Sequence, residues 1–294
     1  MAHLMYHVAF LLLYRLVGSV YKKNRVYLNY DYELKGVRIM EDITIREFEF
    51  ALINEFFTEL ERQGPGSSEE TIRALSFISN LSSKAKIADL GCGTGAQTMV
   101  LAQHTEAIIT ALDLYAGSID KLNVTAEKLG LQNRVKGIVG SMDNLPFRND
   151  EFDLIWSEGA IANIGFEKGL NHWKNFLKKD GYVVITYESW FTDERPAEIE
   201  KWWVDAVPEI GTIAHNISIM QKTGYIPVAA FTLPESCWID NYFIPQKARQ
   251  EEFLKKHAGN KTVEDMIAFM RREADLYSKY KQYYGYVFYI GKKL

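Results

Sequence analysis

An acid and three closely spaced glycines form the segment Asp89-Leu90-Gly91-Cys92-Gly93-Thr94-Gly95. It follows a short apolar run and precedes a helical stretch. Glycines let the backbone turn tightly and approach a ligand without a side-chain clash. The N-terminus of the following helix offers free N–H groups to a carboxylate or a phosphate. The segment therefore predicts a small-molecule site, with a plain tight turn of an α/β fold as the alternative.

The spacing of these glycines separates two classes of ligand. It reads G-x-G-x-G, whereas dinucleotide-binding turns read G-x-G-x-x-G. Asp113 lies at the end of the next apolar run, where a carboxylate can accept hydrogen bonds from the paired hydroxyls of a ribose. A capping role at the strand end is the alternative for Asp113. The pattern favours a ribose-containing ligand other than a nicotinamide dinucleotide.

Alternating strands and helices must position these residues. Short apolar runs alternate with helical stretches between residues 87 and 187, as is typical of parallel strands that are buried on both faces. Crossovers between such strands are right-handed. The sequence therefore predicts an open, doubly wound α/β sheet. The expected strands are 87–90, 107–114, 135–139, 152–157 and 182–187, and the expected helices include 99–102, 118–129 and 170–177.

Helical patterns precede and follow this alternation. Apolar residues three and four apart predict an amphipathic helix over 43–60, which the breaker 63–68 ends. Ser68 is expected to cap a second helix that carries apolar residues as far as Leu81. Beyond Ser189 the pattern predicts helices at 196–207, 213–223, 246–257 and 262–280, and strands at 225–233 and 284–290.

The composition argues against several classes of protein. A net charge of −4 over 294 residues gives no reason to expect a nucleic-acid partner. Two cysteines exclude a disulfide scaffold and favour a reducing, cytoplasmic location. The six histidines lack metal-binding spacing, so no metal is expected. Aromatic residues are uneven, with 25 in residues 151–294 and five in residues 51–150.

Residues 1–14 contain no Asp, Glu, Lys or Arg. Arg15 ends this apolar stretch before it reaches the roughly 18–20 residues of a membrane-spanning helix, so no integral span is expected. The stretch also lacks the basic start and the cleavage site of a signal peptide. Three interpretations stay open: a short helix docked on the domain, a start placed too early with Met40 opening the regular chain, or secretion or membrane association.

Four elements taken in order resemble the class I S-adenosylmethionine-dependent methyltransferases: the glycine turn, Asp113, the segment 140–147 and the segment 152–159. Members of this family share an E/D-x-G-x-G-x-G turn, an acid closing the second strand, a G-D-A-x-x-L-P-F-like stretch and an F-D-x-x-x-S strand. The resemblance covers roughly Ile87 to Tyr187. It is nearest to the small-molecule group that includes the ubiquinone/menaquinone C-methyltransferases.

The resemblance implies a fold and a division of the chain. The fold is a Rossmann-like, mostly parallel seven-stranded sheet with an antiparallel last strand, an N-terminal helical cap and C-terminal helical inserts. Residues 1–39 would be an extension, 40–84 the cap, and 85–190 the core that binds S-adenosylmethionine and releases S-adenosylhomocysteine. Residues 191–294 would supply acceptor-side inserts and the last two strands of the same domain.

The resemblance also implies roles for matching residues. Asp89 would orient the glycine turn or the amino group of the methionine moiety, Asp113 would hold the ribose, and Ser141 and Met142 would flank the adenine. Residues 62–67 resemble a glycine-proline loop found before the first strand in some members, or are a plain helix breaker. The expected cofactor-binding residues are Gln63, Gly64, Asp89, Gly91, Cys92, Gly93, Gly95, Asp113, Leu114, Ser141, Met142, Asp143 and Ser157.

Two positions carry alternatives. The family often has Asp where Ser141 stands, so either Ser141 or Asp143 would accept a hydrogen bond from the adenine amino group. Glu158 is the candidate general base, with a carboxylate that only lines the pocket as the alternative. No N/D-P-P-Y motif follows the fourth strand, so methylation of an adenine or glutamine amino group by that route is unsupported. Weaker candidates for the site are Glu188, His172, His215 and Asn163.

The expected activity is methyl transfer to a small-molecule acceptor. A nicotinamide-dependent oxidoreductase and a non-catalytic relative that binds S-adenosylmethionine are the alternatives, and a homodimer stays open. Seven aromatic residues of the added segments either surround a planar or cationic acceptor or pack in the core. They are Trp190, Phe191, Trp202, Trp203, Trp238, Tyr242 and Phe243.

Overall fold

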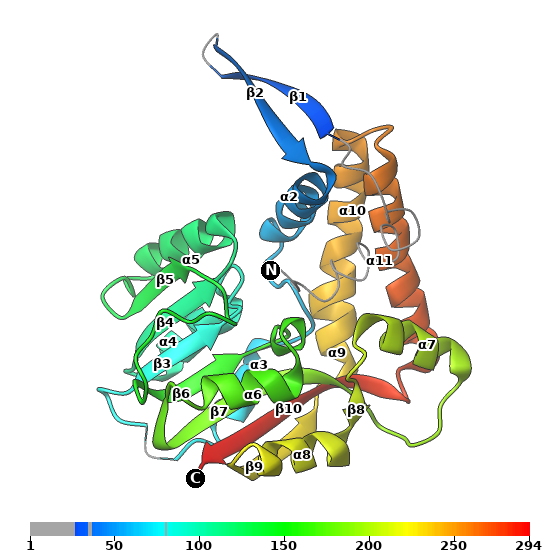
Figure 1. Ribbon diagram of the computed structural model, residues 1–294. Coiled ribbons are helices and arrows are strands. Elements are labelled where there is room, and N and C mark those ends of the chain that lie inside the picture. Colours follow the sequence, from blue (N-terminus) through cyan, green and yellow to red (C-terminus); the bar gives the residue numbers. More distant parts are fainter. Residues whose placement is uncertain (1–26, 35–36, 80) are drawn as a thin grey trace.

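A computed structural model describes residues 27–34, 37–79 and 81–294. Its centre is a mixed sheet with helices on both sides (Figure 1). Seven long strands follow the order β5, β4, β3, β6, β7, β10, β9, and the short β8 pairs with β7. Their bounds are β3 Lys86–Leu90, β4 Ile108–Asp113, β5 Val135–Val139, β6 Phe152–Ser157, β7 Leu177–Trp190, β8 Gly211–Thr212, β9 Tyr225–Thr232 and β10 Tyr284–Lys293.

The strand directions confirm the expected sheet. Strands β5, β4, β3, β6 and β7 are parallel to one another, and β10 is antiparallel to both of its neighbours, β7 and β9. The last strand thus lies inside the sheet between β7 and β9 rather than at its edge. The two-residue β8, which the sequence pattern did not indicate, makes the sheet eight-stranded.

Apolar runs form the central strands because both faces of the sheet are covered. Ile87, Leu90, Ile109 and Leu112 of β3 and β4 are completely buried, as expected for parallel strands between helical layers. The parallel strands also end together, so the residues that follow β3, β4 and β6 meet at the carboxyl edge of the sheet. Ligands of open α/β sheets bind at this edge.

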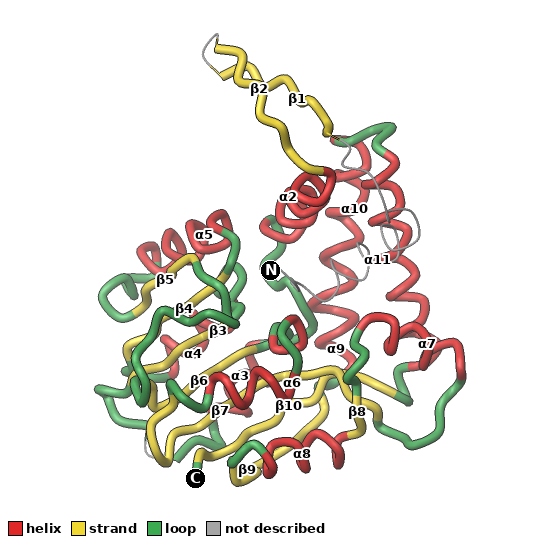
Figure 2. Tube along the Cα trace, in the orientation of Figure 1, coloured by secondary structure: helices red, strands yellow, loops and turns green. Residues whose placement is uncertain are grey.

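Ten α-helices accompany the sheet in the described part of the chain, and Figure 2 shows them on its flanks. Their bounds are α2 Ile45–Thr58, α3 Ser68–Leu75, α4 Ala96–His104, α5 Ala116–Lys128, α6 Phe166–Trp173, α7 Ala197–Ala206, α8 Ile213–Lys222, α9 Glu235–Trp238, α10 Ile244–Lys256 and α11 Lys261–Tyr280. A 3₁₀ turn, η1 (Ile161–Asn163), and a π-helical turn, η2 (Ile239–Phe243), complete the set.

Helices from opposite ends of the chain pack together above the carboxyl edge. The ring of Phe56 on α2 meets that of Phe253 on α10 edge-on, with centroids 5.4 Å apart. Arg249 on α10 donates through Nη2 to the carbonyl oxygen of Glu55, at 3.1 Å. In Figures 1 and 2, α2 lies beside α10, and α11 runs beside α10. The N-terminal cap and a C-terminal insert therefore form one helical layer.

Two expected helices have different bounds. Ser67, not Ser68, caps α3, because its side chain accepts from the backbone N–H of Glu70, and α3 ends at Leu75 rather than near Leu81. The helix expected over 170–177 is α6, which ends at Trp173, while Leu177 already begins β7. Apolar spacing over so few residues fits a helix and a strand equally well, which explains the shift.

The N-terminal interpretations for residues 1–14 lie outside the described residues. Strands β1 (Tyr27–Leu34) and β2 (Val37–Thr44) pair with each other in antiparallel orientation, so the expected boundary between residues 39 and 40 falls within β2. The amphipathic helix expected from residue 43 begins at Ile45. Within the described ranges, no helix is both long and apolar enough to cross a membrane.

Candidate functional site

The glycine turn after β3 requires glycine for two reasons. Gly91 and Gly93 have φ angles of +72° and +55°, which residues with side chains rarely adopt. There is also no room for a side chain, because a Cβ at Gly91 would lie 2.3 Å from Cβ of Ala160, and one at Gly93 would lie 2.4 Å from Oε1 of Gln63. The turn is therefore pressed closely between two other loops.

Asp113 at the end of β4 faces this turn. Its Oδ2 accepts from the backbone N–H of Gly93 at 2.9 Å, and its Oδ1 accepts from the backbone N–H of Tyr115 at 3.0 Å. The residue is 2% exposed and lines the pocket beside the turn. A carboxylate in this position is a hydrogen-bond acceptor that suits the hydroxyls of a ligand.

Asp89 lies under the turn rather than in the pocket. It is completely buried, and its carboxylate accepts from Thr98 Oγ1 at 2.6 Å and Gln97 Nε2 at 3.3 Å, both on α4. Burial raises the pKa of Asp89 to about 7. Because these contacts join the end of β3 to the first turn of α4, they favour the first of its two expected roles, orienting the glycine turn.

The loop between α2 and α3 covers the turn. Thr94 Oγ1 donates to the carbonyl oxygen of Glu61 at 3.3 Å. On the other side, Asn241 Nδ2 donates to the carbonyl oxygen of Gly66 at 2.8 Å, and the N–H of Gly66 donates to the carbonyl oxygen of Cys237 at 3.4 Å. The loop is thus held between the glycine turn and the insert that contains α9 and η2.

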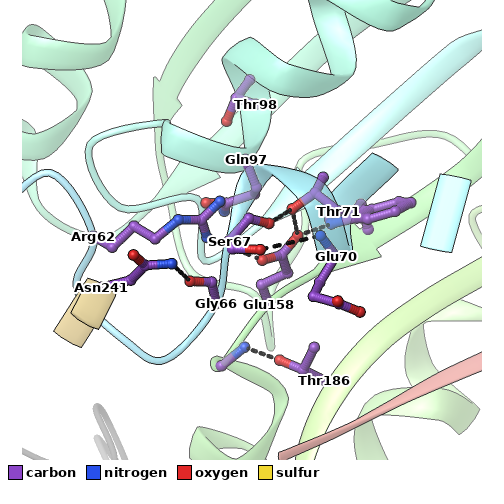
Figure 3. Close-up of polar contacts among 12 residues, drawn as sticks. Arg62, Gly66, Ser67, Glu70, Thr71, Gln97, Thr98, Glu158, Thr186 and Asn241 are labelled. Atoms are coloured by element: carbon purple, nitrogen blue, oxygen red, sulfur yellow. Dashed lines mark hydrogen bonds and ion pairs between the residues drawn. The ribbon is translucent and has the colours of Figure 1, made fainter. Parts of the chain in front are cut away.

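Glu158, just after β6, connects this loop to the sheet (Figure 3). Its Oε1 accepts from Thr71 Oγ1 at 2.7 Å and from Trp156 Nε1 at 2.9 Å, and its Oε2 lies 3.3 Å from Arg62 Nη1. The ion pair is buried, with the side chains of Arg62 and Glu158 11% and 5% exposed. A carboxylate held by three donors is suited to fixing the loop.

A pocket of about 100 Å³ lies among these groups. Its walls come from the cap, the glycine turn, and the ends of β4, β6 and β10. The residues that line it include Arg62, Gln63, Gly93, Asp113, Glu158 and Tyr286. Three or more His, Cys, Asp or Glu side chains that could hold a metal ion do not come together anywhere in the described ranges.

Comparisons with known proteins fit this arrangement. Residues 87–181 match a family described as a methyltransferase domain. A sterol 24-C-methyltransferase of Gibberella zeae is 24% identical over 148 residues, which are 48% of this chain and 39% of that protein. A sarcosine/dimethylglycine N-methyltransferase of Aphanothece halophytica is 27% identical over 110 residues, which are 37% of this chain and 40% of that protein. The chain thus spans about two fifths of the length of these relatives.

A solved structure extends the likeness in fold. The S-adenosylmethionine-dependent methyltransferase from Geobacter sulfurreducens, crystallised with S-adenosylhomocysteine, matches with a TM-score of 0.73 at 16% identity. The match covers 83% of this chain and 98% of the other. This chain thus has the fold of the S-adenosylmethionine-dependent methyltransferases, with a match to a methyltransferase domain over residues 87–181.

Several of the residues expected to bind the cofactor, together with Glu158, line the pocket. They are Gln63, Gly64, Gly91, Cys92, Gly93, Asp113 and Glu158. Met142 lies against this group, because its Cε is 3.0 Å from the position of a Cβ on Gly91. Residues from the glycine-proline loop, the turn and two strand ends are therefore brought together across a wide span of sequence.

Other expected residues do not line this pocket. The hydroxyl of Ser157 donates to the carbonyl oxygen of Leu90 at 2.8 Å and ties β6 to β3. Ser141 donates to Asp143, so the two alternatives for the adenine contact are joined to each other. Asp89, Gly95 and Leu114 support the turn and the end of β4 from outside the lining.

Several residues that line the pocket were not among the expected site residues, and Arg62 and Tyr286 are two of them. Arg62 stood next to the expected Gln63 but carried no motif of its own, although a lone cation before the glycine-proline loop was a usable signal. Tyr286 belongs to β10, which the pattern indicated only as a closing strand. In contrast, the seven aromatic residues expected around an acceptor are absent from the described lining of this pocket.

Proposed function

We propose that this protein transfers a methyl group from S-adenosylmethionine to a small-molecule acceptor. The observation that carries the proposal is the buried Asp113 carboxylate. It is hydrogen-bonded to Gly93 in the wall of a pocket at the carboxyl edge of the sheet. The match of residues 87–181 to a methyltransferase domain supports the same activity. The cofactor, when bound, supplies an activated methyl group on a positively charged sulfur.

The polar groups of the pocket suit this cofactor. The carboxylate of Asp113, on the pocket wall, is an acceptor that suits ribose hydroxyls. Arg62 lines the pocket, and its Nη2 is buried without a hydrogen-bond partner within the described ranges. A guanidinium donor in this position suits the carboxylate of the methionine moiety. Gly91 and Gly93 let the backbone approach the ligand, as expected.

The protein contributes position and shielding to the reaction. Holding the acceptor in line with the methyl group can supply roughly 7–11 kcal/mol of the barrier. The loop over the glycine turn excludes water, because it is held from both sides by Thr94 and Asn241. We assign Glu158 to holding this loop through Arg62 and Thr71, which favours its expected alternative as a pocket residue over a general base.

We also propose separate roles for the parts of the chain. The core 85–190 binds the cofactor, while the cap 40–84 and the inserts in 191–294 surround the acceptor. A cytoplasmic location agrees with two free, buried cysteines, and a homodimer is tested by light scattering on the full chain. The named relatives act on sterols and on sarcosine or dimethylglycine, which differ in chemistry, so the acceptor must be sought in this chain's own side chains.

Calorimetric titration of the purified protein with S-adenosylhomocysteine and, separately, with NAD tests the proposal. We expect saturable binding of S-adenosylhomocysteine at one site per chain and no binding of NAD at the same concentrations. Tight binding of NAD without binding of S-adenosylhomocysteine would replace the proposal by the oxidoreductase alternative. Binding of neither compound would remove the methyltransferase proposal.

A further inference from the structure

A second polar cluster lies next to the pocket, and the proposed function does not use it. Glu188 on β7 and Glu273 on α11 are 2% and 1% exposed. The hydroxyl of Tyr286 on β10 donates to Glu188 Oε1 at 3.0 Å. Burial and then the charge of Glu188 raise the pKa of Glu273 to about 8. Two acidic side chains are therefore enclosed together between the sheet and α11.

Several polar atoms in this cluster lack a well-formed hydrogen bond, although Gln246 lies beside the Tyr242 hydroxyl and Trp203 beside that of Tyr284. Over the described ranges, Oε2 of Glu273 and the hydroxyls of Tyr242 and Tyr284 form no hydrogen bond of normal geometry. Both tyrosines are 1% exposed. Burial, and after it the charge of Glu273, raise the pKa of each phenol well above its usual value. Buried polar atoms normally have partners, so this group is arranged for a ligand.

The cluster also lacks a balancing cation. No Lys or Arg within residues 51–79 and 81–294 forms an ion pair with Glu188 or Glu273. A buried carboxylate is costly unless a positive charge or several donors accompany it. The groups that face Glu273 are acidic or neutral: Glu188, Tyr242, Tyr284 and Tyr286. A cation would therefore fit as a partner of the cluster, displacing the proton that Glu273 holds at its raised pKa of about 8.

Aromatic rings line the same region. Trp238 stacks on Tyr277 with centroids 4.5 Å apart, and it meets Tyr286 and Tyr284 edge-on at 5.1 Å and 6.1 Å. Ring faces attract organic cations, most strongly where water is excluded. Carboxylates together with aromatic rings recognise a substituted ammonium group better than a metal ion, which would need several oxygen ligands.

Tyr286 links this cluster to the cofactor pocket. Its side chain lines the pocket and packs on Gly159, while its hydroxyl reaches Glu188. Figure 1 shows β7 and β10 side by side at the sheet end of α11. A ligand held by the cluster would therefore lie beside Tyr286, next to the cofactor pocket.

We propose that the Glu188–Glu273 cluster binds the positively charged nitrogen of the methyl acceptor, and that the acceptor is a small amine. This inference rests on the proposed function. The protonated nitrogen gives its proton to the carboxylate of Glu188, which frees the nitrogen lone pair. The lone pair then forms the new N–C bond to the methyl carbon as the C–S bond breaks, and the electrons of that bond remain on sulfur.

Two probes of equal shape and different charge test the inference. Choline carries a quaternary ammonium group, and 3,3-dimethyl-1-butanol is its neutral counterpart. Calorimetric titrations at pH 7 use the full chain saturated with S-adenosylhomocysteine. We expect choline to bind at least about tenfold more tightly than the neutral alcohol, as a cation held by rings and a carboxylate requires. Titration in buffers of different ionisation enthalpy is expected to show proton release from Glu273.

Two variants on α11 locate the binding. Glu273→Gln keeps the shape of the side chain and is expected to lose the preference for choline and the proton release. Asp275→Asn removes an exposed carboxylate two residues away and is expected to keep both. Circular dichroism and affinity for S-adenosylhomocysteine verify that each variant is folded.

The results separate this inference from the proposed function. Equal binding of choline and the neutral alcohol by protein that binds S-adenosylhomocysteine would overturn the amine acceptor and leave the methyltransferase proposal intact. Preference for choline that survives Glu273→Gln would overturn this site. Failure to bind S-adenosylhomocysteine would contradict the proposed function itself.

Discussion

At the scale of single residues, Asp113 and Glu158 show how one residue type performs different tasks. Both are carboxylates just beyond the carboxyl ends of parallel strands, and both line the pocket. Asp113 accepts the backbone N–H groups of Gly93 and Tyr115, and we propose that it also accepts from the ribose. Glu158 accepts from three side chains, which come from the cap and from β6. Neighbouring donors, rather than position on a strand, separate the two roles.

Asp113→Ala is expected to weaken binding of S-adenosylhomocysteine by about 1–3 kcal/mol, or roughly 5- to 150-fold, because ribose hydroxyls and the N–H of Gly93 lose their acceptor. Calorimetry measures the change. Asp120→Ala, at an exposed position of α5, is the matched control and should bind as the wild type does. Unchanged affinity in Asp113→Ala would remove this residue from the site.

The buried pair of Arg62 and Glu158 should be energetically coupled. A double-mutant cycle with Arg62→Met and Glu158→Gln is expected to give a coupling free energy of unfolding of about 0.5–3 kcal/mol, because both partners are shielded from water. Urea unfolding measures it. The exposed pair Glu70–Arg73, at a similar distance of 3.2 Å, is the control and should give at most about 0.5 kcal/mol. Equal coupling in both pairs would argue against the buried Arg62–Glu158 pair as the contact that holds the loop.

At the scale of elements, α11 is the helix whose burial changes the chemistry of its residues most. It runs for 20 residues, and Glu273 on its buried side faces the sheet, while Asp275 is exposed. Helical spacing alone identifies the buried face but places an acid there without a reason. The packing of α11 against β7, β10 and η2 supplies the reason, because all three bring polar groups to Glu273.

Glu273 should make stability depend on pH. Its pKa of about 8 in the folded protein lies above its ordinary value of 4.5 in the unfolded chain. The folded state therefore holds the proton more tightly, and this group lowers stability as pH rises from 4.5 to 8, by up to about 1.4 kcal/mol per pH unit. Glu273→Gln should be favoured over the wild type increasingly across this window in urea unfolding. A difference that is constant with pH would contradict the buried acid.

At the scale of the whole molecule, residues from both halves of the chain enclose the cofactor side. The loop from the N-terminal cap reaches the glycine turn through Glu61 and Thr94, and the C-terminal insert holds the same loop through Asn241. The aromatic-rich half of the chain mostly builds the inserts: Trp202, Trp203 and Trp238 are at most 5% exposed. Core packing, the second of the two expected roles, describes Trp202 and Trp203, while Trp238 belongs to the rings beside the Glu188–Glu273 cluster.

Asn241→Ala should loosen the loop over the bound ligand. We expect the dissociation rate of S-adenosylhomocysteine to rise by about three- to tenfold, since one hydrogen bond of roughly 0.5–1.5 kcal/mol is lost. Stopped-flow tryptophan fluorescence measures the rate. Asn175→Ala also removes a side-chain hydrogen bond to a backbone carbonyl, but at an exposed site after α6, and should leave the rate unchanged. The same rate in both variants would show that the insert does not hold the loop.

The sequence by itself determined the local features of this protein. Period and glycine spacing depend on neighbouring residues, so the ranges of β5 and β6, the turn after β3 and the placement of Asp113 were all predictable. Only the tertiary structure decided which distant residues meet. Arg62 with Glu158, Tyr286 with the pocket, and Glu188 with Glu273 are contacts between separate elements. Such contacts leave no periodic signal, because they arise from the packing of helices and strands that are far apart in the chain.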